Sequence, residues 1–407
     1  MAINKADIAD KPTVLAVGLF VPGTGFTRVF ETLFAHLSID LSIHWMGIGY
    51  KGPVTMHEHY TLHPVNVNGG DIYGAFGAAA MASSLNVKSI LLLTDFYLLK
   101  NYCRQLLPLK EKGTRLVAYV PLDGYFINSD LIEDCLFLDE LVLYNKWALQ
   151  EVKMAGERYR TEKQISDSTW PEMSYVYHGT DIKVFSAASN SNKKQELKTS
   201  LFNVPDASQS TFILNANRFN ERKDIPATIA AFAKALPHFN SPVYLCLHTP
   251  NLQPHIRTNL LTEIENSGCK ERILLNPLGN DYCTNEALTG LYTACDIGVN
   301  TSLGEGWGMI SFEHAACGAA QLVPGHTAPA ELWKGAGVLI PAQKSIQLST
   351  NPFLMYSVNT DALATELVQL VNDKEHLANT ASTCSTHVKN EVFNWQKIAG
   401  QWLEKLA

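Results

Sequence analysis

Two glutamates separated by a glycine-rich loop are the residues in this sequence best suited to carry chemistry. Glu305 and Glu313 lie eight positions apart, and Gly306 and Gly308 come between them. Glycine lets the backbone adopt unusual dihedral angles and lets a ligand approach without a Cβ in the way. Carboxylates are poor partners for phosphate but good acceptors for hydroxyl groups. Such a pair alone is more typical of a solvated helix face, and the glycines are what favour a ligand site.

The elements around this loop form a strand, loop and helix unit. Residues 294–300 are a short apolar run that predicts a buried strand ending in a polar loop. Residues 312–317, followed by Gly318, predict a helix. The loop therefore lies directly before a helix N-terminus.

The backbone amides at this position predict an anion site. At a helix N-terminus the unpaired donors and the dipole favour an anion such as phosphate. Glu305 precedes the helix and Glu313 lies about two turns further along. Hydroxyl acceptors on both sides of an anion site suit a ligand with phosphate in the middle and polyols at both ends, which describes a nucleotide sugar. The amides expected to project from the helix are those of Gly308, Met309 and Ile310.

These residues resemble the signature of glycosyltransferase family 4. That signature is usually Glu-Gly-Phe/Trp-Gly, an apolar pair, and Glu-Ala-x-Ala-Cys-Gly. Here residues 305–308 are Glu-Gly-Trp-Gly and residues 313–318 are Glu-His-Ala-Ala-Cys-Gly, with His314 in place of alanine. The resemblance implies retaining transfer of a sugar from a nucleotide diphosphate sugar. It also implies that Glu313 holds the ribose hydroxyls and that Glu305 holds a hydroxyl of the donor sugar.

A polar loop upstream carries two cations. Arg218 ends an expected strand at 211–218, and Lys223 follows five residues later. Two cations at one loop can straddle a diphosphate and neutralise the charge that develops when it leaves. In the family they stand in Gly-Arg and Lys-Gly pairs, whereas here Asn217 and Asp224 replace the glycines. Such cations are often only solvated, and the downstream motif favours the functional interpretation. By resemblance, the donor site combines Arg218 and Lys223 with Gly306, Trp307, Gly308, Met309 and Ile310.

The chain opens on a strand that runs into a glycine turn. Residues 13–20 form a continuous apolar run, typical of a strand covered on both faces. The turn contains Gly23, Thr24 and Gly25, and a dinucleotide-binding turn also begins this way. However, Arg28 stands at the third glycine position, and no acidic residue ends a second strand at the right distance. The resemblance instead places this turn beside the donor diphosphate and the acceptor.

Asp123 follows an expected strand at 116–120. Loops that leave the carboxyl ends of parallel strands line the ligand crevice. In the family a His-Asp pair often occupies this loop, but Leu122 stands here in place of the histidine, so only Asp123 matches. The resemblance implies a role for Asp123 in acceptor chemistry. A turn-forming role before Gly124 is an equal alternative.

Strands alternate with helices along the chain, which predicts an α/β protein with parallel sheets. At 407 residues the chain exceeds what one core usually supports, so two domains are expected. The resemblance implies the GT-B fold, two facing Rossmann-like doubly wound domains with a cleft between them. The expected boundaries are 1–185 for an acceptor domain, 186–210 for a linker, 211–389 for a donor domain, and 390–407 for a helix returning to the first domain.

Composition and charge exclude several classes of protein. The chain is 46% hydrophobic and 17% charged, with a net charge of -7, so nothing in it favours nucleic-acid binding. The eight cysteines show no zinc spacing and predict reduced thiols in a cytosolic protein. Residues 1–12 are polar where a signal peptide needs an apolar core, and the apolar run 90–99 is too short to cross a bilayer. We expect a cytoplasmic protein with at most peripheral membrane contact.

The resemblance thus implies a retaining transferase that moves a sugar from a UDP- or GDP-sugar to a hydroxyl of a glycan, lipid-linked or protein acceptor. No Asp-x-Asp occurs, and two cations with a helix terminus can replace magnesium, so no metal or other cofactor is expected. No clear second carboxylate is available as in a retaining hydrolase. The alternatives are a nucleotide-sugar epimerase or hydrolase, an NAD-dependent oxidoreductase, and a catalytically silent sugar-nucleotide sensor.

Overall fold

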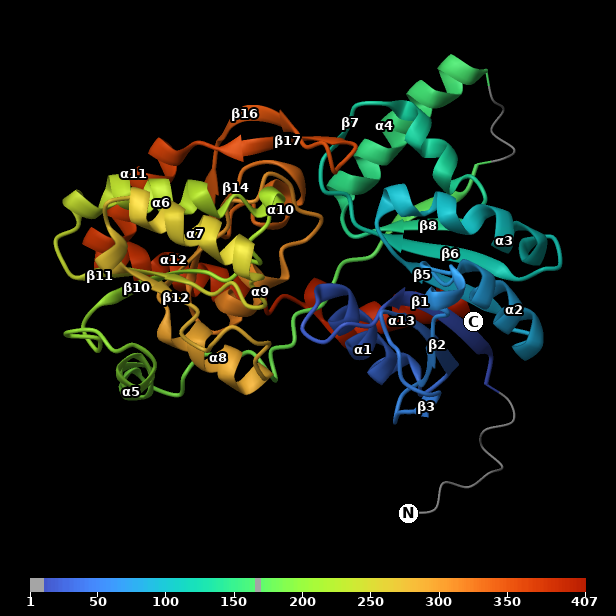
Figure 1. Ribbon diagram of the computed structural model, residues 1–407, viewed down its shortest axis with the longest axis horizontal. Helices are drawn as coiled ribbons and strands as arrows, with labels where there is room; N and C mark the ends of the chain where they lie inside the picture. Colours follow the sequence, from blue (N-terminus) through green and yellow to red (C-terminus); the bar gives the residue numbers. More distant parts are fainter. Residues whose placement is uncertain (1–10, 165–169) are drawn as a thin grey trace, which may run out of the picture. The chain divides into compact units, whose positions relative to one another are not determined.

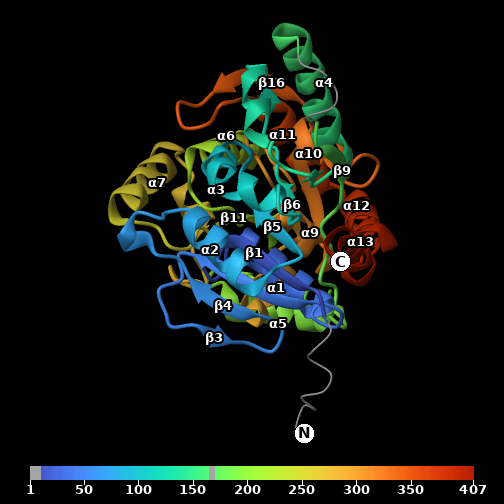
Figure 2. The same ribbon diagram turned by 90° about the vertical axis from the view of Figure 1, so that its right-hand side faces the viewer.

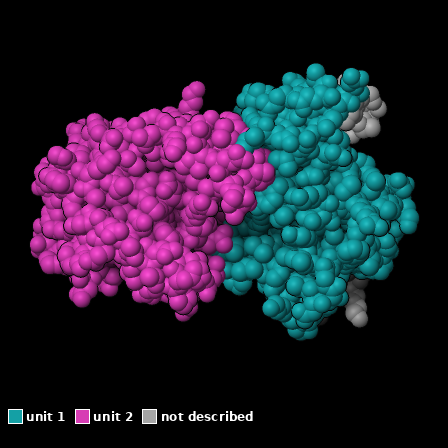
Figure 3. Space-filling model, turned by 45° about the horizontal axis from the view of Figure 1, so that its top comes forward, with its two compact units in different colours: residues 1–122, 126–179, 394–407 teal, residues 123–125, 180–393 magenta. Residues whose placement is uncertain are grey.

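The structure is a computed structural model that describes residues 11–164 and 170–407, so most of the polar segment 1–12 lies outside the described residues. The chain divides into two compact units (Figure 3). Unit 1 comprises residues 1–122, 126–179 and 394–407, and unit 2 comprises residues 123–125 and 180–393.

Unit 1 is built on an eight-stranded sheet in the order β3-β4-β2-β1-β5-β6-β8-β9. Every neighbouring pair is parallel except β3 and β4. The central strands β1 and β5 are buried along nearly their whole length, which explains their uninterrupted apolar sequences. The strands are β1 (Thr13–Leu19), β2 (Ser42–Ile48), β3 (Thr55–Met56), β4 (Thr61–Pro64), β5 (Ser89–Leu93), β6 (Arg115–Val120), β8 (Glu140–Leu143) and β9 (Glu172–Tyr175).

Helices pack against this sheet in two pairs, α1 with α13 and α2 with α3 (Figures 1 and 2). The alanine- and glycine-rich residues 70–85 predict a helix from the sequence, but α2 begins only at Ala75, because Gly74 adopts a left-handed conformation as its N-cap. The helices of unit 1 are α1 (Gly25–Leu37), α2 (Ala75–Leu85), α3 (Lys100–Lys110), α4 (Lys146–Lys163) and α13 (Trp395–Leu406).

The C-terminal helix α13 is fixed to unit 1 through one buried carboxylate. Glu140 accepts hydrogen bonds from Arg115 Nη2 at 2.8 Å, from Ser174 Oγ at 2.7 Å, and from the ammonium of Lys405 in α13. Burial would raise the pKa of Glu140, but Lys405, Ser174 and Arg115 together lower it. Trp402 of the same helix is fully buried. Residues 394–407 therefore belong to the core of a unit whose other residues all precede position 180.

Unit 2 is built on a six-stranded parallel sheet in the order β12-β11-β10-β13-β14-β15. The strand order changes direction between β10 and β13, and in such sheets ligands bind beyond the carboxyl ends of the strands at this point. The strands are β10 (Thr211–Asn215), β11 (Val243–Leu247), β12 (Ile273–Leu275), β13 (Ile297–Val299), β14 (Ala320–Pro324) and β15 (Val338–Ile340).

The helices of unit 2 cover this sheet and close an apolar core that includes Ile213, Phe232, Leu245 and Leu367. The segment 186–210, predicted to be a linker, contains α5 and belongs to unit 2. The helices are α5 (Ser191–Leu201), α6 (Ile225–Ala235), α7 (Pro254–Asn266), α8 (Asn285–Ala294), α9 (Met309–Ala316), α10 (Thr327–Leu332), α11 (Thr360–Asn372) and α12 (Lys374–His387). Within the described residues, no helix has the length and apolar character needed to cross a membrane.

A small sheet in the order β16-β17-β7 was not predicted from the sequence. The strands β16 (Ala342–Gln347) and β17 (Phe353–Val358) form an antiparallel pair, and β7 is Tyr125–Phe126. Most of β16 is exposed and polar, so it carries no strand pattern in the sequence. Met355 of β17 packs on Leu303 in a small apolar cluster with Leu348. This sheet therefore supports the loop that carries Glu305.

Candidate functional site

The candidate site lies in unit 2 at the carboxyl ends of β10, β13 and β14. The loop after β10 ends in a short 3-10 helix, Glu221–Lys223, capped by Asn220, whose Oδ1 accepts a hydrogen bond from the Lys223 amide at 3.1 Å. Thr301, which follows β13, donates from Oγ1 to the Asp224 carbonyl at 2.8 Å. These two contacts fasten the cation-bearing loop to the loop that leads to Glu305.

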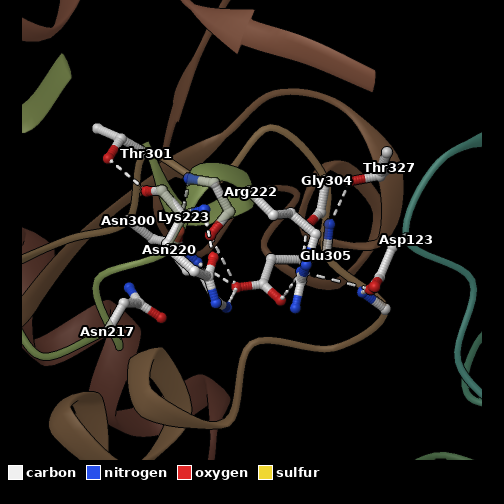
Figure 4. A network of polar contacts seen from close by, with 12 residues as sticks. Asp123, Asn217, Asn220, Arg222, Lys223, Asn300, Thr301, Gly304, Glu305 and Thr327 are labelled. Carbon is white, nitrogen blue, oxygen red and sulfur yellow. Dashed lines mark hydrogen bonds and ion pairs between the residues drawn. The ribbon is translucent and has the colours of Figure 1, made fainter. Parts of the chain in front are cut away.

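Glu305 is the centre of a buried polar network (Figure 4). Its Oε1 accepts hydrogen bonds from the Lys223 ammonium and from Ser302 Oγ at 2.9 Å, and its Oε2 lies 3.2 Å from Arg222 Nη1. Asn300 Nδ2 also donates to Oε1 at 3.3 Å. The side chain is 6% exposed, so both of its oxygens are held in fixed positions away from water.

Glu305 and Lys223 are both ionised in this network. Burial would raise the pKa of Glu305, but Lys223 and Arg222 outweigh burial and lower the pKa to about 2. Burial lowers the pKa of Lys223, and the Glu305 carboxylate opposes that effect. Lys223 and Glu305 therefore form an ion pair at neutral pH.

Arg222 connects Glu305 to Asp123. Its Nη1 donates to the Gly304 carbonyl at 2.5 Å and lies 3.4 Å from Asp123 Oδ1. Asp123 Oδ1 also accepts the backbone N–H of Gly306 at 3.0 Å. Burial raises the pKa of Asp123, and Arg222 only partly offsets this. The expected alternative, a turn-forming role, does not account for these two contacts of the carboxylate.

The loop that presents Glu305 depends on two glycines and one strained residue. A Cβ at Gly304 would lie 1.7 Å from the Asp123 carbonyl oxygen, so only glycine fits there. Gly308 has a φ of +92°. Thr327 Oγ1 accepts the Glu305 amide at 3.3 Å, and Thr327 has a φ of +52°, which is unusual for a β-branched residue. Such strain is typical of functional sites, where the surrounding structure enforces it.

Helix α9 begins at Met309, and Gly308 is its N-cap. No side chain among the described residues caps this end of the helix, and Met309 and Ile310 are partly exposed. Glu313 is the fifth residue of α9, which places it about one turn into the helix and not the expected two. The helix begins at Met309, three residues before the predicted start at 312. Glu313 is buried, and its Oε2 accepts a hydrogen bond from Tyr292 at 3.2 Å.

Three further predicted site residues lie outside the Glu305 network, and their contact with a donor stays a prediction. Trp307 is buried and stacks on Phe312 with ring centroids 5.0 Å apart, so its side chain serves packing. Arg218 is exposed and forms no ion pair within the part of the chain that the structure describes. Thr24 lies in unit 1 as the N-cap residue of α1, flanked by Gly23 and Gly25, and its contact with a donor stays a prediction.

The structure thus brings together Glu305, Lys223, Asp123 and the Gly306 amide, and it adds residues that the sequence reading missed. Arg222 adjoins Lys223 and gave a visible signal, a second cation in the same loop. Ser302 and Asn300 lie in the polar loop after β13, but nothing in their types distinguished them from ordinary loop residues. The eight cysteines are free thiols, and no group of three or more metal-ligating side chains occurs among the described residues.

Two α/β units, each built on a mainly parallel sheet, together with the likeness to solved structures, identify the GT-B fold. Known structures similar to this chain include a sucrose-phosphate synthase from Thermosynechococcus elongatus, with 16% identity, a TM-score of 0.69, and coverage of 97% of this chain and 98% of that one. The Anabaena protein HepE, solved with UDP and glucose, gives 13% identity, a TM-score of 0.70, and coverage of 97% and 99%. A trehalose-6-phosphate synthase from Burkholderia multivorans gives 12% identity, a TM-score of 0.68, and coverage of 97% and 96%.

At these identities the likeness establishes the fold. No family model matches the chain, and no curated protein sequence matches it. The resemblance to glycosyltransferase family 4 in particular therefore stays a prediction.

Proposed function

We propose that this protein is a retaining glycosyltransferase that uses a nucleotide diphosphate sugar, with UDP or GDP as the nucleotide. The observation that carries the proposal is the buried cluster of Glu305, Lys223 and Arg222 beside the N-terminus of α9. The cluster lies at the carboxyl edge of a parallel sheet, where ligands of such sheets bind. The Anabaena structures solved with UDP and glucose and with UDP-glucose support this choice of donor.

In this proposal Lys223 serves two ligands at once. An ammonium has three donors, and one of them contacts Glu305. The remaining donors suit the diphosphate, whose developing charge Lys223 and Arg222 stabilise when the glycosidic bond to the donor breaks. The amides at the start of α9, where Met309 and Ile310 are partly exposed, take further phosphate oxygens. Glu313, within the same helix, holds the ribose hydroxyls.

Glu305 holds a hydroxyl of the donor sugar. Ser302 and Asn300 fix its carboxylate, so the acceptor atom is preorganised before the sugar arrives. The new bond forms between the acceptor oxygen and the anomeric carbon on the face from which the diphosphate departs. The departing phosphate oxygen then takes the proton of the acceptor hydroxyl. The acceptor is a hydroxyl-bearing glycan, lipid-linked glycan or protein, and Asp123 is the candidate residue for contacting it.

Thermal-shift measurements with UDP, GDP, their sugars and NAD test the proposal. Binding of a ligand raises the melting temperature by mass action, so a nucleoside diphosphate or its sugar should raise Tm while NAD should not. A rise with NAD alone would support an oxidoreductase instead. Steady conversion of the donor without any acceptor would indicate an epimerase or hydrolase, and binding without turnover across an acceptor panel would indicate a sensor.

A further inference from the structure

The carboxylate of Asp123 occupies a position that would suit an anionic ligand. Its Oδ1 accepts the Gly306 N–H at 3.0 Å and lies 3.4 Å from Arg222 Nη1. Gly306 directly follows Glu305 and lies two residues before the N-cap of α9. A backbone amide and a guanidinium that converge on one oxygen form the donor pair typical of phosphate sites.

The charges of the network explain why Asp123 stays there. Lys223 and Arg222 supply two positive charges, and Glu305 supplies one negative charge to both. Asp123 supplies the second negative charge and balances the set. The side chains of Arg222 and Asp123 are only 25% and 18% exposed. Leaving the charge of Arg222 without this partner would therefore cost free energy. Only another anion can take the place of this carboxylate without leaving that imbalance.

We propose that Arg222 and the Gly306 amide form a seat for a phosphate oxygen, and that Asp123 occupies this seat until a donor binds. The inference rests on the proposed function, because it names a subsite for the donor diphosphate. A sugar hydroxyl is excluded as the natural occupant, since a neutral oxygen does not replace the charge of Asp123. Donor binding then exchanges one anion for another and releases the Asp123 carboxylate for the acceptor.

Calorimetric titration of the 407-residue chain tests the exchange. Wild type, Asp123→Ala and Asp123→Asn are compared with UDP, GDP, inorganic pyrophosphate and uridine as ligands. Removal of a competing charged partner should tighten binding of a nucleoside diphosphate and of pyrophosphate by about tenfold in Asp123→Ala. Uridine has no phosphate, so its affinity should not change. Asp123→Asn keeps an acceptor for the Gly306 N–H and loses only the charge, so it should show a smaller gain.

A matched control is Glu263→Gln, which removes one negative charge from the exposed face of α7. It should leave every affinity unchanged and so separates a local exchange from a general effect of charge. If both Asp123 variants bind the nucleoside diphosphates and pyrophosphate no more tightly than wild type does, the proposed seat is wrong. If pyrophosphate gains affinity while no nucleotide binds any variant, the seat stands and the donor proposal fails.

Discussion

The ammonium of Lys223 donates directly to Oε1 of Glu305, although the two residues lie far apart in the sequence. Each comes from a loop at the carboxyl edge of the same sheet, and neither charge is exposed enough to be satisfied by water alone. The pair therefore fixes the geometry of the candidate site before any ligand binds.

Breaking this pair should strongly reduce the rate of sugar transfer. Glu305→Gln and Lys223→Met preserve side-chain size, and each should reduce kcat/KM by roughly 100- to 1,000-fold, the usual effect of removing one preorganised transition-state contact. The sequence alone suggests that alanine at either position would leave the fold intact. The burial seen here implies instead a loss of about 3–5 kcal/mol of stability when one partner is removed. Sugar transfer and urea unfolding measure the two effects.

The double variant with both changes separates these effects, because it removes the pair without leaving one charge buried. It should recover part of the lost stability and none of the activity. Wild-type activity in both single variants would refute the assignment of the site.

The depressed pKa of Glu305 predicts acid sensitivity. The pKa is about 2 in the folded chain against an ordinary value of 4.5, so ionised Glu305 favours the folded state. Its contribution is fully present above pH 4.5 and is lost as the pH falls toward 2. The difference corresponds to about 3 kcal/mol. Urea unfolding at pH 6, 5, 4 and 3 should show the advantage of wild type over Glu305→Gln shrinking steadily below about pH 4.5. A constant difference would show that the carboxylate does not gain this stability on folding.

Arg222 should matter more than Arg218. Arg222 contacts Glu305, Asp123 and the Gly304 carbonyl, whereas Arg218 is exposed. Arg222→Ala should lower kcat/KM by about 100-fold and Arg218→Ala by less than about tenfold. Arg257→Ala on the exposed side of α7 is the control for losing a positive charge. If Arg218→Ala proves the more damaging, the family-based assignment is correct and donor binding must reposition that loop.

Transfer should not require a divalent metal. Lys223, Arg222 and the amides of α9 supply the positive charge that a metal would otherwise provide at the diphosphate. Dialysis against excess EDTA, followed by assay with and without Mg²⁺ or Mn²⁺, should give equal rates. Strong inhibition by EDTA that added metal reverses would contradict this account.

Glu140 and Lys405 should stabilise unit 1 without affecting donor chemistry. Glu140 is 1% exposed, so Lys405→Met, which removes one partner, should cost about 3 kcal/mol of unfolding free energy. Trp402→Ala should cost about 3–5 kcal/mol, because a fully buried aromatic ring is lost. Glu404→Gln, on the exposed side of α13, should change stability by less than about 0.5 kcal/mol. If Lys405→Met leaves the free energy of unfolding unchanged, the ion pair does not stabilise the position of α13.

The sequence allowed most of the regular elements to be predicted. Residues 89–93 are apolar enough to predict a strand from the sequence alone, and β5 has the bounds Ser89–Leu93, because a strand buried on both faces leaves a continuous apolar run. The hairpin of β16 and β17 escaped because β16 is polar and exposed. Residues 325–331, after β14, predict a turn from the sequence, but they contain most of α10, because a helix of six residues is too short to show a helical period.

The candidate site was predictable only in part. The spacing between Glu305 and Glu313, and the family signature around them, predicted the loop and the role of Lys223. The contact between Asp123 and the Gly306 amide was not predictable, because a pairing of residues so distant depends on tertiary structure alone. Arg222 and Arg218 have the same side chain in the same loop, and only the 3-10 helix capped by Asn220 determines which one faces Glu305.

The return of residues 394–407 to unit 1 has a consequence for synthesis on the ribosome. Unit 2 is complete in sequence once residue 393 has emerged, whereas unit 1 still lacks α13 and the side chain of Trp402. Unit 2 can therefore reach its final structure first, although its sequence begins later. Until α13 has been synthesised, the first half of the nascent chain exposes the apolar surface that α13 later covers. We expect chaperones to bind this surface during synthesis.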